Sequence, residues 1–351
     1  MKKQARVFIQ MGPGGVGKTT VSAAFGFYWA KQGYKVLVMT IDPSKRLAQA
    51  LGIQGRQGVA RVPVDLPKGE LSAMLLDHSE IFDSFVRRAA QKNPMAERLF
   101  QNKLYQALKT RLQGTQDFTA LIELYERATS GEFDIVVLDT PPAQHAWQFL
   151  EAPEKLATLF QDKVAKWFRW LGGSDENPSL WSKMINVGTQ QVLKALEILT
   201  GEEFVLQIAD FFRGMQSFQT QLFDKIIASR DLLESSHTEF TLVTTQDELK
   251  IKESLEYAQE MKSRGYHLKR VLINRAWPEN LQADLKGYEG WQKQEIETLL
   301  NLLGSHQESN QKLLKNWPRG VKVLKVYDTL KSSHDLERLQ QMADDMLKAF
   351  E

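Results

Sequence analysis

The sequence predicts an α/β protein with a doubly wound, mostly parallel sheet and an inserted α-helical subdomain. One observation is a glycine-rich loop that stands between an apolar strand and a helix near the start of the chain. Another is that short apolar runs alternate with amphipathic helical stretches, which is the rhythm of parallel βαβ units. A long helical stretch rich in large apolar residues interrupts this alternation. We therefore expect a phosphate-loop domain at 1–153 and 237–351, interrupted by a helical subdomain at 154–236.

The composition of the 351 residues excludes several classes of function. The 45 basic and 43 acidic side chains leave a formal net charge of +2, so nothing attracts the whole chain to nucleic acid or to an anionic membrane. The sequence has no cysteine, which excludes disulfides, thiolate metal sites and thiol catalysis. It also has no signal region and no run of about 18 apolar residues. We expect a cytoplasmic protein with at most peripheral membrane contact.

The glycine-rich loop follows a predicted strand at 6–11 and satisfies the pattern G-x-x-x-x-G-K-[ST] with Gly12, Gly17, Lys18 and Thr19. Glycines allow successive backbone N–H groups to curl around a phosphate. In such a loop the lysine reaches the β- and γ-phosphates and the hydroxyl ligates Mg²⁺. A glycine-rich turn that matches by chance is the alternative, and the apolar strand before the loop argues against it. The predicted nucleotide-binding residues here are Gly14, Gly15, Val16, Gly17, Lys18, Thr19 and Thr20.

A second strand follows one helix after the first. The helix runs from Lys18 to about Gln32, Gly33 ends it, and the strand covers 35–41. Asp42 comes directly after this strand, at the end of the sheet where ligands bind in open parallel sheets. Its carboxylate could orient a water toward the γ-phosphate, or it could cap the next helix. The spacing alone does not favour either interpretation.

The most hydrophobic strand, at 133–138, ends in Asp139. Paired with an upstream phosphate loop, this is the Walker-B arrangement, in which a strand delivers a carboxylate to the Mg²⁺ shell, usually through water. His145 lies just beyond, where either a γ-phosphate sensor or an ordinary structural histidine would fit. Between the second strand and this one we expect a polar connection at 56–68, a strand at 71–77, helical residues at 79–112 and a helix at 115–129.

Three segments of the chain resemble one family. They are the loop at 12–20, the pair at 42–43 and the stretch at 139–153, and together they are similar to the arsenite-pump ATPases, a family that includes the ATPases that guide tail-anchored proteins to membranes. A strand at 240–244 and the Asn-Arg pair that ends a strand at 271–275 are a further resemblance. The family's second-switch pattern, D-T-x-P-T-G-H-T-L-R-x-L-x-x-P, is matched in its bacterial D-T-P-P form at Asp139, Thr140, Pro142, His145, Leu150 and Pro153.

The resemblance implies a deviant-Walker ATPase that binds ATP and Mg²⁺ and works as a dimer. It implies that Asp42 polarises the attacking water and that Lys18 acts with it in catalysis. Thr19 and Asp139 would hold Mg²⁺, the latter through water. It further implies switch residues at Pro142 and His145, an adenine contact from Asn274, and a base-side loop of Val326, Tyr327 and Asp328.

The chain also departs from the family pattern. The family loop carries a signature lysine, which crosses the dimer to the partner's nucleotide, where this chain has Pro13. Proline supplies no charge, so we expect either slow turnover by a homodimer or a heterodimer with a paralogue that keeps the lysine. Ala143, Gln144 and Gln148 replace the family's Thr, Gly and Arg. The absence of cysteine excludes the family's arsenite site and its zinc-bridging C-x-x-C.

The predicted subdomain at 154–236 carries many aromatic residues, among them Trp167, Trp170 and Trp181. By the resemblance it would bind a hydrophobic client helix, whereas the plain alternative is that these rings pack in its own core. Besides a client-binding ATP switch, we therefore consider a nucleotide-binding pseudo-enzyme subunit and, as the least favoured alternative, a partition-type ATPase.

The remaining predicted elements are a helix at 253–264, helical residues within 278–318, a strand at 321–326 and a final helix from about 334.

Overall fold

The structure is a computed structural model of the chain, and it falls into two compact units. Unit 1 comprises Met1–Leu76, Leu124–Trp147 and Asp231–Glu351, and unit 2 comprises Asp77–Glu123 and Gln148–Arg230. Asp42, His145, Asp328 and the aromatic residues at 167, 170 and 181 lie outside the described residues. The structure describes residues 3–41, 46–54, 58–90, 99–103, 105–106, 113–142, 146–152, 207, 210–211, 214, 219–276, 289–327 and 335–350.

Unit 1 is built on an eight-stranded sheet of order β3-β4-β2-β5-β1-β6-β7-β8. Every neighbouring pair is parallel except β3 and β4, which confirms the predicted doubly wound, mostly parallel α/β fold. The strands are β1 (Arg6–Met11), β2 (Lys35–Thr40), β3 (Val59–Arg61), β4 (Glu70–Leu75), β5 (Ile135–Asp139), β6 (Thr238–Thr244), β7 (Leu268–Ala276) and β8 (Lys322–Tyr327). The polar connection expected at 56–68 is wrong in part, because β3 pairs there with the edge of β4.

The centre of the sheet positions the site. β1 lies between β5 and β6, so that Gln10 pairs with Asp139 on one side and with Thr241 on the other. The residues from Val7 to Met11 are all buried, as expected for a central parallel strand covered on both faces. The carboxyl ends of these three strands therefore meet at one edge of the sheet.

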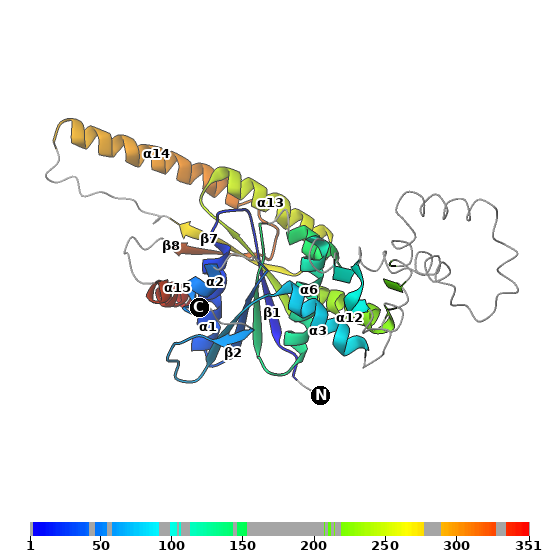
Figure 1. Cartoon of the computed structure of the whole chain (residues 1–351). Helices are drawn as coiled ribbons and strands as arrows, with labels where there is room; N and C mark the ends of the chain where they lie inside the picture. The colour runs from blue at the N-terminus through cyan, green and yellow to red at the C-terminus, as the bar shows by residue number, and fades with distance from the viewer. Residues whose placement is uncertain are drawn as a thin grey trace, which may run out of the picture. The chain divides into compact units, whose positions relative to one another are not determined.

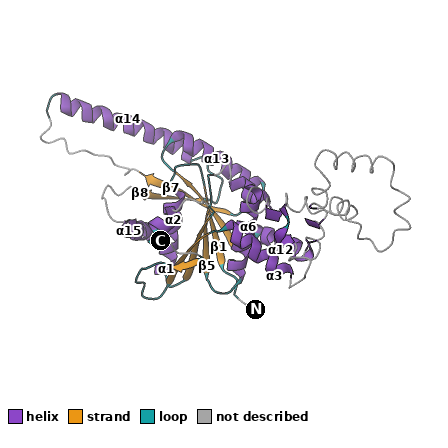
Figure 2. Ribbon diagram, viewed as in Figure 1, coloured by secondary structure: helices purple, strands orange, loops and turns teal. Residues whose placement is uncertain are grey.

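Helices cover both faces of this sheet. Figure 1 shows α1, α2 and α15 together on one side of the sheet and α13 on the other. Phe8 of β1 packs against the rings of Phe25 and Trp29 of α1, with ring centroids 5.1 and 5.5 Å away. The helices, distinguished from the strands in Figure 2, are α1 (Lys18–Lys31), α2 (Arg46–Ala50), α13 (Glu248–Ser263), α14 (Trp291–Leu314) and α15 (Asp335–Phe350).

Unit 2 has an aromatic core of its own, which includes Phe85, Tyr105, Phe118 and Ile226. The Tyr105 hydroxyl donates to the Asp83 carboxylate over 2.7 Å, and burial together with this carboxylate raises the pKa of Tyr105. The helices are α3 (His78–Ala90), α6 (Gln113–Thr129) and α12 (Gln219–Glu234), of which α6 and α12 begin in unit 2 and end in unit 1. Unit 2 therefore includes Asp77–Glu123, which the predicted helical subdomain does not contain. The boundaries given for that subdomain, 154–236, stay a prediction.

Two further findings concern the helices. Within the described ranges, no helix is both long enough and apolar enough to cross a membrane. α13 begins at Glu248 instead of at 253, because the Asp247 carboxylate accepts from the Lys250 backbone N–H over 3.0 Å and caps the helix. The earlier start adds a turn at the end of β6, next to the phosphate loop.

Candidate nucleotide-binding site

The phosphate loop connects β1 to α1 in the way that the motif predicts. Gly12 has a φ of 150° and lies so close to β6 that a Cβ atom there would be 2.0 Å from the Val243 carbonyl oxygen. Gly17 has a φ of 85° and stands directly before the first residue of α1, Lys18. Only glycine fits both positions, so that close packing against β6 and a left-handed turn shape the loop.

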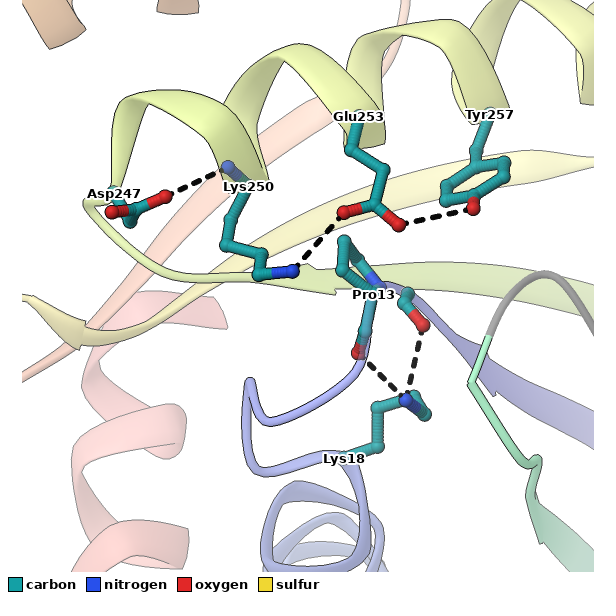
Figure 3. Close-up of polar contacts among 7 residues, drawn as sticks. Pro13, Lys18, Asp247, Lys250, Glu253 and Tyr257 are labelled. Atoms are coloured by element: carbon teal, nitrogen blue, oxygen red, sulfur yellow. Dashed lines mark hydrogen bonds and ion pairs between the residues drawn. The ribbon is translucent and has the colours of Figure 1, made fainter.

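The Lys18 ammonium lies across the loop. Its Nζ donates to the carbonyl oxygens of Gly12 over 3.0 Å and Pro13 over 2.8 Å (Figure 3), and the residue is only 8% exposed. A cation held here, at the N-terminus of a helix, is arranged to attract phosphate oxygens. The structure thus places the Lys18 ammonium on the glycine-rich loop, at the position that its sequence predicts.

Asp139, the last residue of β5, accepts hydrogen bonds from three hydroxyl groups. Its Oδ2 accepts from Thr19 Oγ1 over 2.7 Å and from Thr40 Oγ1 over 3.0 Å, and its Oδ1 accepts from Ser22 Oγ over 3.3 Å. Asp139 is completely buried. Its carboxylate thereby joins the phosphate loop, the first turns of α1 and the end of β2 in one network.

Burial raises the pKa of the Asp139 carboxyl from 3.8 to about 6, although Thr19, Thr40, the Lys18 charge and Ser22 all oppose the rise. Desolvation of the ionised form therefore outweighs three hydrogen bonds and a nearby cation. A carboxylate that is costly to bury alone gains most from a metal cation. We expect the affinity of this site for Mg²⁺ to fall below about pH 6, where protonation competes with the cation.

Asp139→Asn should become more stable relative to the wild type as the pH rises. Between about pH 4 and 6 the unfolded state has released the Asp139 proton while the native state holds it, so raising the pH destabilises the wild type. Above about pH 6 both states are ionised and this loss is complete. Asparagine does not titrate. We expect its stability advantage without nucleotide to grow by about 2 kcal/mol between about pH 4.5 and 7.

Urea unfolding of both proteins at the two pH values measures this change, since every other titrating group is common to both and cancels. A constant difference in the free energy of unfolding would show that Asp139 keeps its ordinary pKa in the native state.

The side chains around Asp139 fit Mg²⁺. A hydroxyl and a carboxylate are the hard oxygen donors that this cation prefers, and the cation usually keeps waters and phosphate oxygens as its other ligands. Thr19 would hold the ion through Oγ1, and Asp139 would hold it through a water. When bound, Mg²⁺ would neutralise charge on the transferring phosphate. No cluster of three acidic or histidine side chains that could hold a metal ion lies among the described residues.

Asn274 of β7 fastens the loop to the sheet. Its Nδ2 donates to the Val16 carbonyl over 2.8 Å, and a Cβ on Gly17 would lie 2.4 Å from that same nitrogen. Asn274 also lines a cavity of about 110 Å³ beside α1. The cavity adjoins the loop, and its lining includes the predicted base-side residues Val326 and Tyr327, together with Thr20, Arg275, Arg338 and Met342.

The segment after β5 lies against the loop. A Cβ on Gly14 would be in ordinary contact, at 3.9 Å, with the Cβ of Pro142. Thr140 Oγ1 donates to the Gln10 carbonyl over 2.8 Å, and the Ala146 N–H donates to the Pro142 carbonyl over 3.1 Å. The predicted switch residue Pro142 is therefore beside the phosphate loop.

Sequence reasoning missed several members of the site. Ser22 follows Thr19 by three residues on α1, so its helical spacing was a usable signal. Thr40 is a polar residue at the carboxyl end of β2, the end at which ligands bind. No local pattern indicates Arg338 or Met342, because α15 reaches the cavity through packing on α1.

Comparison with known proteins agrees with this geometry. The sequence matches the anion-transporting ATPase family over residues 5–330. It is 23% identical over 350 residues to "Putative arsenical pump-driving ATPase 1" of Aquifex aeolicus, covering 96% of this chain and 78% of the relative. It is 26% identical over 263 residues to "ATPase get3" of Schizosaccharomyces pombe, covering 75% and 71%. Identity to "ATPase get3" of Schizosaccharomyces japonicus is 29% over 155 residues, covering 44% and 45%. With its phosphate loop, its buried strand-end aspartate and a match over nearly its whole length, the chain belongs to the anion-transporting ATPase family and is an ATPase.

Proposed function

We propose that the chain is a cytoplasmic, Mg-ATP-dependent switch that works as a dimer and binds a hydrophobic client or partner protein through its helical unit. The observation that carries this proposal is the position of Asp139. One carboxylate receives hydrogen bonds from the phosphate loop and from the end of β2, and it begins the segment that leads toward unit 2. Binding or loss of a phosphate and its Mg²⁺ would therefore change the hydrogen bonds of Asp139, the residue at which that segment begins.

Chain connectivity supports the coupling. From Asp139 the chain passes Pro142 beside the loop and enters the helical residues 146–152. The boundary between the units falls inside this helix, between Trp147 and Gln148. Only a short stretch of chain, from Asp139 to Trp147, separates the Thr19–Asp139 hydrogen bond from unit 2 in the sequence. A change in this bond on metal binding would be passed to unit 2 through that stretch. Nucleotide contacts that differ between two states are what a switch requires.

The proposed roles of the residues follow from their chemistry. Lys18 and the loop N–H groups bind and orient the phosphates, Thr19 and Asp139 hold Mg²⁺, and Asn274 with Val326, Tyr327 and Asp328 borders the base. Asp42, two residues after Thr40, would orient the attacking water. His145, three residues after Pro142, would respond to the γ-phosphate. The described neighbours Thr40 and Pro142 lie at the site, which supports these two assignments.

Pro13 favours a second candidate, a subunit that binds nucleotide but depends on a lysine-bearing paralogue for hydrolysis. Proline offers neither charge nor an N–H group at a position where the family loop has a lysine. In this alternative the same site binds Mg-ATP, but the purified chain hydrolyses it no faster than background.

Molar mass by light scattering, with steady-state hydrolysis on the same sample, separates the candidates. With Mg-ATP we expect hydrolysis and a doubling of the molar mass relative to the ADP sample, because the triphosphate would complete the interface. Binding of a fluorescent apolar helical peptide should differ between the ATP and ADP samples. ATP binding without hydrolysis or self-association would favour the paralogue-dependent subunit. A chain that binds no nucleotide would refute both.

A further inference from the structure

Three side chains form a hydrogen-bonded array along one face of α13. Lys250 Nζ lies 3.2 Å from Glu253 Oε2, and the Tyr257 hydroxyl donates to Glu253 Oε1 over 3.1 Å. Glu253 therefore uses one carboxylate oxygen for the lysine and the other for the tyrosine. Partial burial and then Glu253 raise the pKa of Tyr257 to about 12, so its hydroxyl remains a donor that holds the carboxylate in place.

The lysine end of this array lies next to the phosphate loop. Gly12 packs on the Val243 carbonyl at the end of β6, and α13 begins at Glu248, a few residues further on. Pro13 is buried, and Figure 3 shows its ring pointing toward the face of α13 that carries Lys250 and Glu253. The uncharged residue Pro13 thus points toward the side of α13 from which the Lys250 side chain extends.

The tyrosine end of the array lies against the segment that follows β5. The ring centroid of Tyr257 is 6.4 Å from that of Trp147, and the Arg264 guanidinium lies 4.9 Å from the Trp147 ring. Trp147 belongs to the helical residues that follow Pro142. The array therefore connects the phosphate loop with the segment expected to move with the nucleotide.

Charge and exposure indicate what the array can do. The Lys250 and Glu253 side chains are 36% and 29% exposed, and an ion pair at that exposure adds little stability, so it separates at little cost. A triphosphate on the loop carries several negative charges beside Lys18, whose ammonium spans the Gly12 and Pro13 carbonyls. Such a concentration of negative charge attracts an ammonium on the neighbouring helix face more strongly than the single charge of Glu253 does.

We propose that Lys250 is a second phosphate-facing cation of the nucleotide site, supplied from α13 in place of a charged residue at position 13. Glu253, held by Tyr257, stores the ammonium until a triphosphate is bound on the same chain's loop, and the ammonium then turns toward the terminal phosphate. Lys250 thus distinguishes ATP from ADP. This role rests on the proposed nucleotide-dependent switch and extends it.

The test compares binding of fluorescent ATP and ADP analogues, with Mg²⁺, to the full chain and to two matched variants. Lys250→Gln should weaken ATP binding by about tenfold and ADP binding by no more than about twofold, because the lost cation faces the terminal phosphate. Lys252 lies on the same turn of α13, and its Nζ pairs with Glu248 over 2.6 Å. Lys252→Gln removes this other cation and should change the affinity for neither ATP nor ADP.

Two more variants separate a charge effect from a change in the helix. Lys250→Arg keeps the charge and should retain most of the ATP preference. Glu253→Gln releases the ammonium and should strengthen ATP binding by about threefold. Equal affinities for Lys250→Gln and the wild type, or equal losses of ATP and ADP binding, would overturn the proposal. Failure of the wild type to bind ATP would instead refute the proposed function, so the two failures are distinguishable.

Discussion

Lys18→Met should lower kcat/KM for Mg-ATP by about 10²- to 10³-fold, the usual effect of removing one preorganised charge from a transition state. Methionine keeps most of the methylene stem, so packing under the loop changes little, whereas the cation that spans the Gly12 and Pro13 carbonyls is gone. Fluorescent nucleotide binding and steady-state phosphate release measure the loss of affinity and the loss of turnover separately.

Lys31→Met is the matched control for this change. Lys31 is the last residue of the same helix, and its Nζ pairs with Asp344 over 2.6 Å, far along α1 from the loop. A partly exposed pair of this kind is worth about 1 kcal/mol or less, so we expect normal hydrolysis. If Lys18→Met hydrolysed ATP as well as Lys31→Met does, the phosphate loop would not be the catalytic nucleotide site.

Gly12→Ala should destabilise the nucleotide-free protein by about 3 kcal/mol or more. The added Cβ would lie 2.0 Å from the Val243 carbonyl oxygen, 3.1 Å from its carbon and 3.3 Å from its nitrogen. These are main-chain atoms in the middle of the sheet, which cannot rotate away as a side chain can. Either β1 and β6 separate or the loop is rebuilt, and urea unfolding measures the cost.

Gly14→Ala offers the comparison within the same loop. Its Cβ would meet nothing closer than the Pro142 Cβ at 3.9 Å, which is ordinary van der Waals contact. We expect its free energy of unfolding to stay within about 0.5 kcal/mol of the wild type. Equal stabilities of the two variants would mean that Gly12 does not pack against β6 as described.

Much of the site was predictable because its chemistry is local in the sequence. The spacing from Gly12 to Thr19 specifies a phosphate loop, and an apolar strand that ends in Asp139 specifies where a metal carboxylate belongs. Asn274 came only from the family resemblance, and the structure adds that it fastens the loop through the Val16 carbonyl. For the fold, alternating strands and helices were sufficient to predict the parallel sheet.

The rest depends on contacts between distant parts of the chain. The three residues of β3 carry no strand signal of their own and form a strand only against β4. Lys250 belongs to no sequence motif. Its proposed role at the nucleotide site depends on the close packing of Gly12 against Val243 of β6, the strand that precedes α13. The earlier start of α13 could have been predicted, since Asp247 is a good N-cap residue. Asp42, His145 and Asp328 stay predictions.

The position of β1 between β5 and β6 has a consequence for the order of events during synthesis. β1 is made before both of its partner strands, so one of its hydrogen-bonding edges stays unpaired until β5 has been made and the other until β6 has been made. Asn274, which fastens the loop, comes later still. At about 5–20 residues per second this wait lasts on the order of ten seconds or more. A nascent or truncated chain that ends before β6 carries the complete phosphate-loop motif but lacks the strand and the Asn274 side chain that hold the loop, so we expect it to capture no nucleotide.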